Sequence, residues 1–392
     1  MIILQNSGIG NKFVAMRFAD IPGLEELKRK LIASVRDHKV PHASLFHGKE
    51  GALSLPMTIA FAAYLHCENR TSDDSCGLCA GCNLSKKFIH PDTHFAFPVG
   101  NMKTELKEKD DEKLRNELLK LWRSFLSEHP FGSPEDWISY YGGDDKQPII
   151  SREDGREIIR SLSLRPFQSK VKVMIIWQPE MMHSSAANGL LKILEEPPAY
   201  TYFMLATSQA NQLLPTILSR TQKISVPVLS EEEMKKALST RVKADPVQLD
   251  RAIGFAQGDV QEAIRLLSLE ENDYQELFQE WMRSCFKLDP VNLIQLSEKF
   301  HGDDRLQQRG LMLYGLHIMR ESLLLSAKAS DLWRSRGKEL DFVQKFSSVL
   351  SVNKIDKVAT AFNDSIYQLE RNGSAKMIFM DLSLKINAVL KA

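Results

Sequence analysis

Four cysteines lie within sixteen positions of this 392-residue chain, and their type and spacing indicate metal binding. Cys67, Cys76, Cys79 and Cys82 follow the pattern C-x8-C-x2-C-x2-C. Four thiolates suit the tetrahedral coordination of zinc, with Zn–S bonds of about 2.3 Å. The alternatives are disulfides, which a reducing cytosol disfavours, and unrelated buried thiols, as we interpret the solitary Cys285. The pattern predicts a structural zinc ion, because a closed all-cysteine site leaves no position for a reactive water.

A second stretch has the context of a phosphate-binding loop without its chemical groups. The sequence predicts a short strand over 42–48 that runs into a glycine turn, followed by a helix over about 56–64. In this context backbone N–H groups and a helix N-terminus bind an anion. If Gly48 and Gly51 are the first two glycines, the expected Gly-Lys-Thr or Gly-Lys-Ser is replaced by Leu-Ser-Leu centred on Ser54. We expect a degenerate loop that has lost ATP hydrolysis and ATP binding.

The elements that position these groups can be read around residues 171–220. Val173–Trp177 and Tyr202–Ala206 are apolar runs typical of strands buried in a parallel sheet. A helix is expected between them, capped by residue 184 or 185 and ended by the prolines at 197 and 198. An ATPase carries an acidic pair after the first of these strands, to hold magnesium and orient water. Trp177 and Gln178 occupy those positions and cannot serve either purpose.

Several separated motifs together resemble the AAA+ clamp-loader family of DNA replication, and within it the delta-prime class of bacterial DNA polymerase III. The motifs are the run from Ala187 to Pro198, the strand ending at Thr207 and the segment LPTILSR that ends at Arg220. Gly258–Ile264 also resembles the family's lid motif, with Gln261 in place of the arginine that touches ATP. The resemblance covers residues 16–270 well and the remainder only in its helix pattern.

This resemblance implies an α/β plus all-α protein with a RecA-like, parallel five-stranded sheet. A capping box from Ser230 to Glu233 is expected to open the helical lid. The first fifteen residues are interpreted as a leader or an upstream translation start. A charged, turn-rich insertion is interpreted as solvated, with a partner-binding excursion as the alternative. The expected parts are a leader (1–15), an AAA+ module (16–226) with a zinc module (67–82) and an insertion (98–148), a helical lid (227–272) and a helical collar (273–392).

The resemblance also implies a role in an assembly that places a sliding clamp on primed DNA. The implied partners are gamma/tau-type ATPase subunits, a delta-type subunit, the clamp and the primed DNA. Ser219 and Arg220 match the family's Ser-Arg-Cys motif, with Thr221 in place of cysteine, so Arg220 is expected to act in a neighbour's ATP site. The alternative is a solvated arginine that interacts favourably with a helix C-terminus. We expect no ATP, only zinc, as a cofactor.

Other polar residues receive a structural interpretation. His90 and His94 are expected at a turn and a strand edge, and Thr207, at the position where the family senses γ-phosphate, is expected to bond within its loop. Glu195 and Glu196 are adjacent in a helix, so they point apart and are interpreted as solvated.

The composition limits the functions that the chain can have. Lysine and arginine total 51 against 50 aspartates and glutamates, so no global positive charge indicates nucleic-acid binding. No apolar run of about 18 residues and no signal peptide is present, which predicts a cytoplasmic protein without a membrane. One alternative function is an ATPase subunit of the same loader, which would need an intact phosphate loop. Another is a stand-alone zinc-ribbon nucleic-acid binder, for which Lys86, Lys87 and Phe88 offer a small basic and aromatic surface.

Overall fold

The computed structural model divides into two compact units. The first takes the chain as far as Lys243 together with Ala256–Glu262, and the second takes Ala244–Phe255 and the chain from Ala263. The expected leader, 1–15, and part of the insertion, 101–110, lie outside the described residues. None of the described helices is long and apolar enough to cross a membrane. The described residues are 16–100, 111–143, 147–163, 165–239, 242, 244–268, 272–303, 305–329, 333, 335, 337–348, 350–370 and 373–391.

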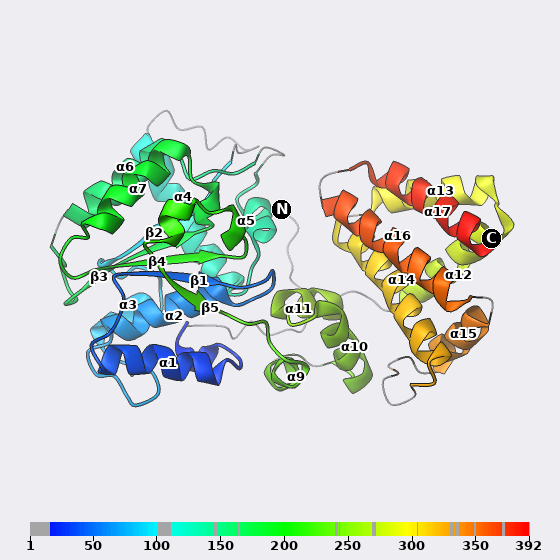
Figure 1. The fold of residues 1–392 in the computed structure, drawn as a ribbon, viewed down its shortest axis with the longest axis horizontal. Helices are drawn as coiled ribbons and strands as arrows, with labels where there is room; N and C mark the ends of the chain where they lie inside the picture. The colour runs from blue at the N-terminus through cyan, green and yellow to red at the C-terminus, as the bar shows by residue number, and fades with distance from the viewer. Residues whose placement is uncertain are drawn as a thin grey trace. The chain divides into compact units, whose positions relative to one another are not determined.

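The first unit is built on a parallel five-stranded sheet, as the sequence predicts (Figure 1). Its strand order is β2-β3-β4-β1-β5, so the first strand of the chain lies between β4 and β5. The apolar runs read from the sequence are the strands at the centre of this order, and β3 is buried along its whole length. The strands are β1 (Ala43–His47), β2 (Thr93–Ala96), β3 (Lys172–Trp177), β4 (Thr201–Thr207) and β5 (Gln222–Ser225).

Helices cover both faces of this sheet. On one face α6 and α7 pack against alternate residues of the central strands, among them Met174, Ile176 and Phe203 (Figure 1). On the other face lies α2, whose Phe61 packs against Phe46 of β1 with ring centroids 6.1 Å apart. The helices as far as α9 are α1 (Glu25–Arg36), α2 (Ser54–His66), α3 (Ala80–Ser85), α4 (Asp111–Glu128), α5 (Pro134–Tyr140), α6 (Arg152–Ser163), α7 (Ser184–Glu195), α8 (Pro215–Leu218) and α9 (Glu231–Ser239), with 3-10 turns η1 (Phe18–Asp20), η2 (Pro179–Met181) and η3 (Ala210–Gln212).

The insertion is not the solvated excursion that its charge suggests. Its helices α4 and α5 bury Trp122 and Trp137, both 0% exposed. The indole of Trp122 stacks on Phe97 at 4.3 Å and lies 5.1 Å from the ring of Trp177, and Trp137 Nε1 donates to Pro98 O at 2.8 Å. The interpretation was wrong because it rested on the charged run 103–113, which ends within the first turn of α4, whereas the apolar residues of α4 recur at helical spacing and form one face.

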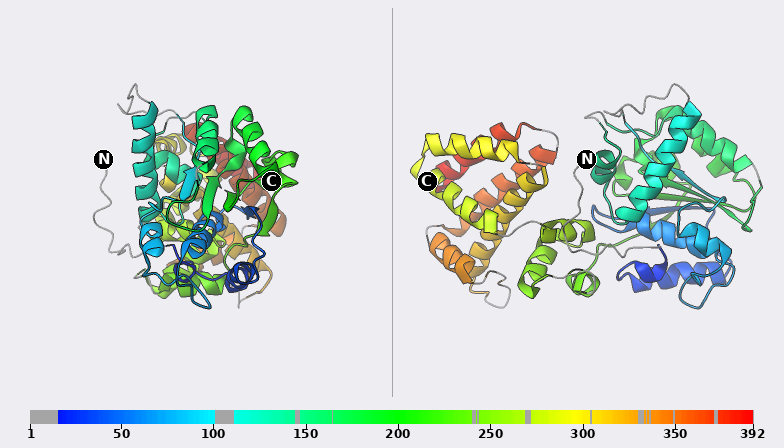
Figure 2. Two further views of the ribbon diagram at one scale, coloured as in Figure 1. Left: turned by 90° about the vertical axis from the view of Figure 1, so that its left-hand side faces the viewer. Right: turned by 180° about the vertical axis from the view of Figure 1, so that it is seen from behind.

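The second unit consists of helices (Figure 2), which pack around an aromatic core. Trp281 stacks on Phe379 at 4.3 Å and meets Phe362 edge-on at 5.7 Å. Cys285 is buried in the same core, as expected for a structural thiol. The helices after α9 are α10 (Pro246–Ala256), α11 (Val260–Ser268), α12 (Asn272–Lys287), α13 (Pro290–Gly302), α14 (Arg305–Ser326), α15 (Gly337–Ser347), α16 (Val352–Glu370) and α17 (Ala375–Lys391).

Candidate functional site

The four predicted cysteines come together at one end of α2. Cys67 is the C-cap of α2, and Cys79 is the N-cap of α3, where its sulfur accepts from Cys82 N at 3.4 Å. All four Sγ atoms lie within 4.8 Å of one another, and those of Cys76 and Cys82 are 3.8 Å apart. A tetrahedron with Zn–S bonds of 2.3 Å has S···S edges of about 3.8 Å. The cluster is therefore compatible with a structural zinc ion.

Two backbone amides stabilise the thiolate form of Cys76. The N–H groups of Leu78 and Cys79 point at Cys76 Sγ from 3.5 and 3.3 Å. These two donors lower the pKa of the Cys76 thiol to about 6, whereas burial raises the pKa of Cys67 and Cys82. The thiolate is the form that binds metal, and a zinc ion would supply the charge that favours it in the two buried cysteines.

The loop between β1 and α2 uses its own carbonyls as hydrogen-bond acceptors. Ala52 N donates to Lys49 O at 3.0 Å, and Ser54 N donates to Ala52 O at 2.8 Å. Gly51 has a φ of +80°, and a Cβ there would lie 2.6 Å from the side chain of Asp259 at the start of the lid motif. Ser54 is buried, and its hydroxyl has no hydrogen-bond partner among the described residues. Two N–H groups that an anion would need are therefore already paired.

Trp177, at the position of an ATPase acid, and Thr207, at the position of the γ-phosphate sensor, both contact other side chains of the first unit. The Trp177 indole packs into the aromatic cluster of the insertion. Thr207 Oγ1 accepts from Gln209 N at 2.8 Å, within its loop as expected, but it also donates to Glu180 Oε1 at 2.7 Å. Burial raises the pKa of the Glu180 carboxyl, and the bond from Thr207 opposes this only in part. Sequence reasoning missed Glu180, although it lies two residues after the substituted acidic pair.

Arg220 lies between α8 and β5, with a third of its side chain exposed (33%). Its Nη1 donates to Thr216 O at 3.0 Å and to Ser219 Oγ at 3.3 Å. Its Nη2 donates to Glu195 Oε1, an ion pair that joins the ends of α8 and α7. Glu195 is exposed (51%), as the interpretation of a solvated helix end expects, but the fold also brings its carboxylate to Arg220 across 25 positions.

The predicted turn and cap residues also have defined partners. His90 is buried and stacks on His66 with ring centroids 3.9 Å apart, while His94 lies in β2. The capping box at the start of α9 is confirmed, with Glu233 N donating to Ser230 Oγ at 3.2 Å. The N-cap of α7 is His183, one or two residues before the expected position 184 or 185, because the ring of His183 accepts from Ser185 N at 3.2 Å.

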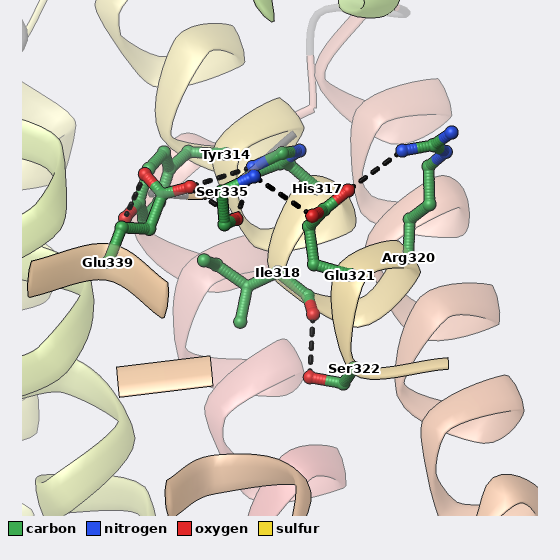
Figure 3. A network of polar contacts seen from close by, with 8 residues as sticks. All are labelled: Tyr314, His317, Ile318, Arg320, Glu321, Ser322, Ser335 and Glu339. Atoms are coloured by element: carbon green, nitrogen blue, oxygen red, sulfur yellow. Dashed lines mark hydrogen bonds and ion pairs between the residues drawn. The ribbon is translucent and has the colours of Figure 1, made fainter. Parts of the chain in front are cut away.

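A buried polar network in the second unit includes a serine, a histidine and a glutamate, but lacks the geometry of a proton relay (Figure 3). Ser335 Oγ and Glu339 Oε1 lie 3.2 and 2.8 Å from the same ring nitrogen, Nε2 of His317. A relay needs the serine and the carboxylate on different nitrogens of the histidine, which is the base. Ser335 also donates its backbone N–H to Glu321 Oε2 at 3.0 Å. Because these side chains are buried, we assign the network to packing of α14 and α15.

The fold and these positions define the chain as an AAA+ clamp-loader protein. The sheet is parallel and five-stranded, as predicted, and the strand, loop and helix of the phosphate-loop context lie at β1 and α2. The chain belongs to the family described as "DNA polymerase III, delta subunit", which matches residues 23–230.

Curated relatives carry names from the same polymerase. The chain is 25% identical over 263 residues to the DNA polymerase III subunit tau/gamma of Haemophilus influenzae, covering 66% of this chain and 31% of that protein. It is 25% identical over 264 residues to the DNA polymerase III subunit gamma of Buchnera aphidicola, covering 66% and 60%. The chain thus spans less than two thirds of the length of these relatives.

Solved structures are similar at low identity. A DNA polymerase III gamma subunit-related protein of Thermotoga maritima aligns with a TM-score of 0.39 at 16% identity, covering 92% of this chain and 99% of that one. The DNA clamp loader delta protein of Bacillus subtilis aligns with a TM-score of 0.30 at 11% identity, covering 93% and 99%.

Proposed function

We propose that this chain is a non-hydrolysing, delta-prime-like subunit of the DNA polymerase III clamp loader in the cytoplasm. In this role it joins gamma/tau-type ATPase subunits and a delta-type subunit, and the assembly places the sliding clamp on primed DNA. The helices of the second unit serve as its collar, and the zinc ion at Cys67, Cys76, Cys79 and Cys82 is structural. The observation that carries the proposal is a partly exposed Arg220 on a chain whose own ATP-site groups are replaced.

The first support comes from the chain's own nucleotide position. The lysine and hydroxyl of the phosphate loop are replaced around Ser54, and Trp177 stands where magnesium would need a carboxylate. The loop amides of Ala52 and Ser54 are paired internally, so binding a phosphate would first cost those two bonds. Titration of the isolated protein with labelled ATP and magnesium should therefore give no micromolar binding and no turnover. Binding with slow turnover would favour the second candidate function below.

The second support comes from Arg220. An arginine donated in trans stabilises the charge on a transferring phosphoryl group, and it is worth about 10³–10⁵ in rate. Its planar fork of donors suits a phosphate better than the point charge of a lysine. A subunit without its own ATP chemistry retains such a group for a neighbour's site.

The test is single-turnover ATP hydrolysis by the reconstituted loader on primed DNA. We expect Arg220→Ala and Arg220→Lys to slow the kinetic phase that depends on this subunit by about 10³-fold or more, to a rate that can still be measured, while the complex still assembles. Arg152→Ala, at an exposed arginine of α6, is the matched control and should leave that phase intact. Wild-type hydrolysis by both Arg220 variants would refute the donated arginine.

A second candidate function, an ATPase subunit of the same loader, is favoured by the gamma and tau names of the curated relatives. It requires that a nucleotide bind without the loop lysine and without the acidic pair. The ATP titration separates the two candidates, because only this one predicts turnover by the isolated chain.

A further inference from the structure

The guanidinium of Arg220 is held by three acceptors from its own unit. Nη1 donates to Thr216 O and Ser219 Oγ, which belong to α8 and its C-cap. Nη2 donates to Glu195 Oε1, and Glu195 is the last residue of α7. Two helix ends that the chain separates by a strand therefore meet at one side chain.

The number of N–H donors on Arg220 shows how many remain free to bind a phosphate. A guanidinium has five N–H donors, and three of those of Arg220 are used by the contacts just named. Two remain, which is the number that a bidentate contact to a phosphate uses. The side chain also keeps a third of its surface exposed (33%). Glu195 thus holds the arginine without occupying all of its donors.

The neighbouring glutamate provides a natural comparison. Glu196 is the C-cap of α7 and is exposed, and its carboxylate makes no hydrogen bond or ion pair within the described part of the chain. It has the same charge as Glu195 and adjoins it in sequence, but it does not contact Arg220. A general effect of negative charge at this helix end would involve both residues, whereas an effect through Arg220 involves only Glu195.

We propose that Glu195 is a positioning residue that orders Arg220 for the ATP site of the neighbouring subunit. The inference rests on the proposed function, because it assigns no role to Glu195 unless Arg220 acts in trans. An arginine on a flexible stem loses rotamer freedom when it meets a phosphate, and contacts that order it beforehand reduce that loss. Glu195 supplies the contact from outside the arginine's own helix, so it defines the direction in which the fork points.

The test is a double-mutant cycle in the reconstituted loader, read by single-turnover ATP hydrolysis on primed DNA. We expect Glu195→Ala to lower the rate constant of the phase that depends on this subunit by about 10- to 100-fold, the range expected for a misplaced group. The ATP concentration at half-saturation should stay unchanged, because Arg220 acts after ATP is bound. Glu195→Gln keeps an acceptor oxygen and should lose less, and Glu196→Ala should equal the wild type.

The cycle separates this inference from the proposed function. In an Arg220→Ala background, Glu195→Ala should have no further effect. If Arg220→Ala impairs hydrolysis but Glu195→Ala does not, the positioning role is wrong and the proposed function stands. An equal loss in both backgrounds would also overturn the role, since Glu195 would then act elsewhere. If Arg220→Ala has no effect, the proposed function itself is refuted, and the positioning role with it. Should Glu195→Ala not assemble, Glu195→Gln carries the same comparison.

Discussion

Asp92 connects two segments of the first unit through one buried carboxylate, and its substitution by asparagine gives a sharp prediction. Its Oδ1 accepts from Phe167 N at 2.6 Å. Its Oδ2 accepts from Gln168 N and Ser169 N at 2.8 and 2.7 Å. Asp92 is 1% exposed, so its two oxygens accept from these amides and not from solvent. The carboxylate therefore determines the path of the loop that enters β3.

The cost of Asp92→Asn can be worked from these contacts. An amide has one acceptor oxygen, which can serve either the Phe167 N–H or the pair from Gln168 and Ser169. The amide NH₂ then faces at least one N–H donor. At least one hydrogen bond to a charged group is lost, worth about 1.5–3 kcal/mol. With the unpaired donor added, we expect the free energy of unfolding of this unit to fall by about 2–4 kcal/mol.

The loss should depend on pH in a defined direction. Burial acts to raise the pKa of Asp92, but the bonds from Ser169, Phe167 and Gln168, with the charge of His90, bring it below its ordinary value. A carboxyl whose folded pKa is depressed stabilises the fold above the unfolded pKa of about 3.9. That contribution is lost as pH falls through the lower, folded pKa. The difference in free energy of unfolding between wild type and Asp92→Asn should be largest between about pH 5 and 7. It should decrease below about pH 3.9.

Two measurements test this reasoning. Urea unfolding of the full chain from pH 7 to 3 gives the difference in stability, with Asp73→Asn, an exposed aspartate, as the control. Hydrogen exchange should show faster exchange of the amides of 167–169 in the variant. A difference below about 0.5 kcal/mol at pH 7, or one that does not narrow in acid, would refute the account.

Three further predictions concern other parts of the chain. Trp177→Asp, which restores one ATPase acid, should destabilise the first unit by about 3 kcal/mol or more in urea because it empties the aromatic cluster, and Trp177→Phe should cost less; equal stability of Trp177→Asp and wild type would contradict this. Protein purified without chelators should contain one zinc ion per chain by elemental analysis, lost in Cys82→Ser and retained in Cys285→Ser; metal-free wild type would disprove the site. Glu339→Ala should destabilise the second unit by about 1–3 kcal/mol, because it removes the buried carboxylate that bonds both His317 and Ser335, and no loss relative to the exposed control Glu298→Ala would refute the role of the network.

Much of the first unit can be predicted from local sequence. The runs around Ile175 and Leu205 are short, apolar and bounded by polar residues, and they form the buried strands β3 and β4. The cysteine spacing also identifies its cluster, because ligands so close in the chain converge within one turn region. The insertion was harder to interpret, since its charged stretch and its apolar helix face share one segment, and only burial of Trp122 distinguishes them.

The sequence by itself determined which elements form and which chemical groups are absent, because periodicity and missing side chains are local properties. Only the tertiary structure decided which distant groups meet. Thr207 bonds Glu180, Asp92 holds the loop at Phe167, and Arg220 pairs with a glutamate 25 positions earlier. The parallel sheet is the physical reason for each meeting. It brings the ends of strands that are far apart in the chain to common edges, where polar side chains satisfy one another's hydrogen bonds.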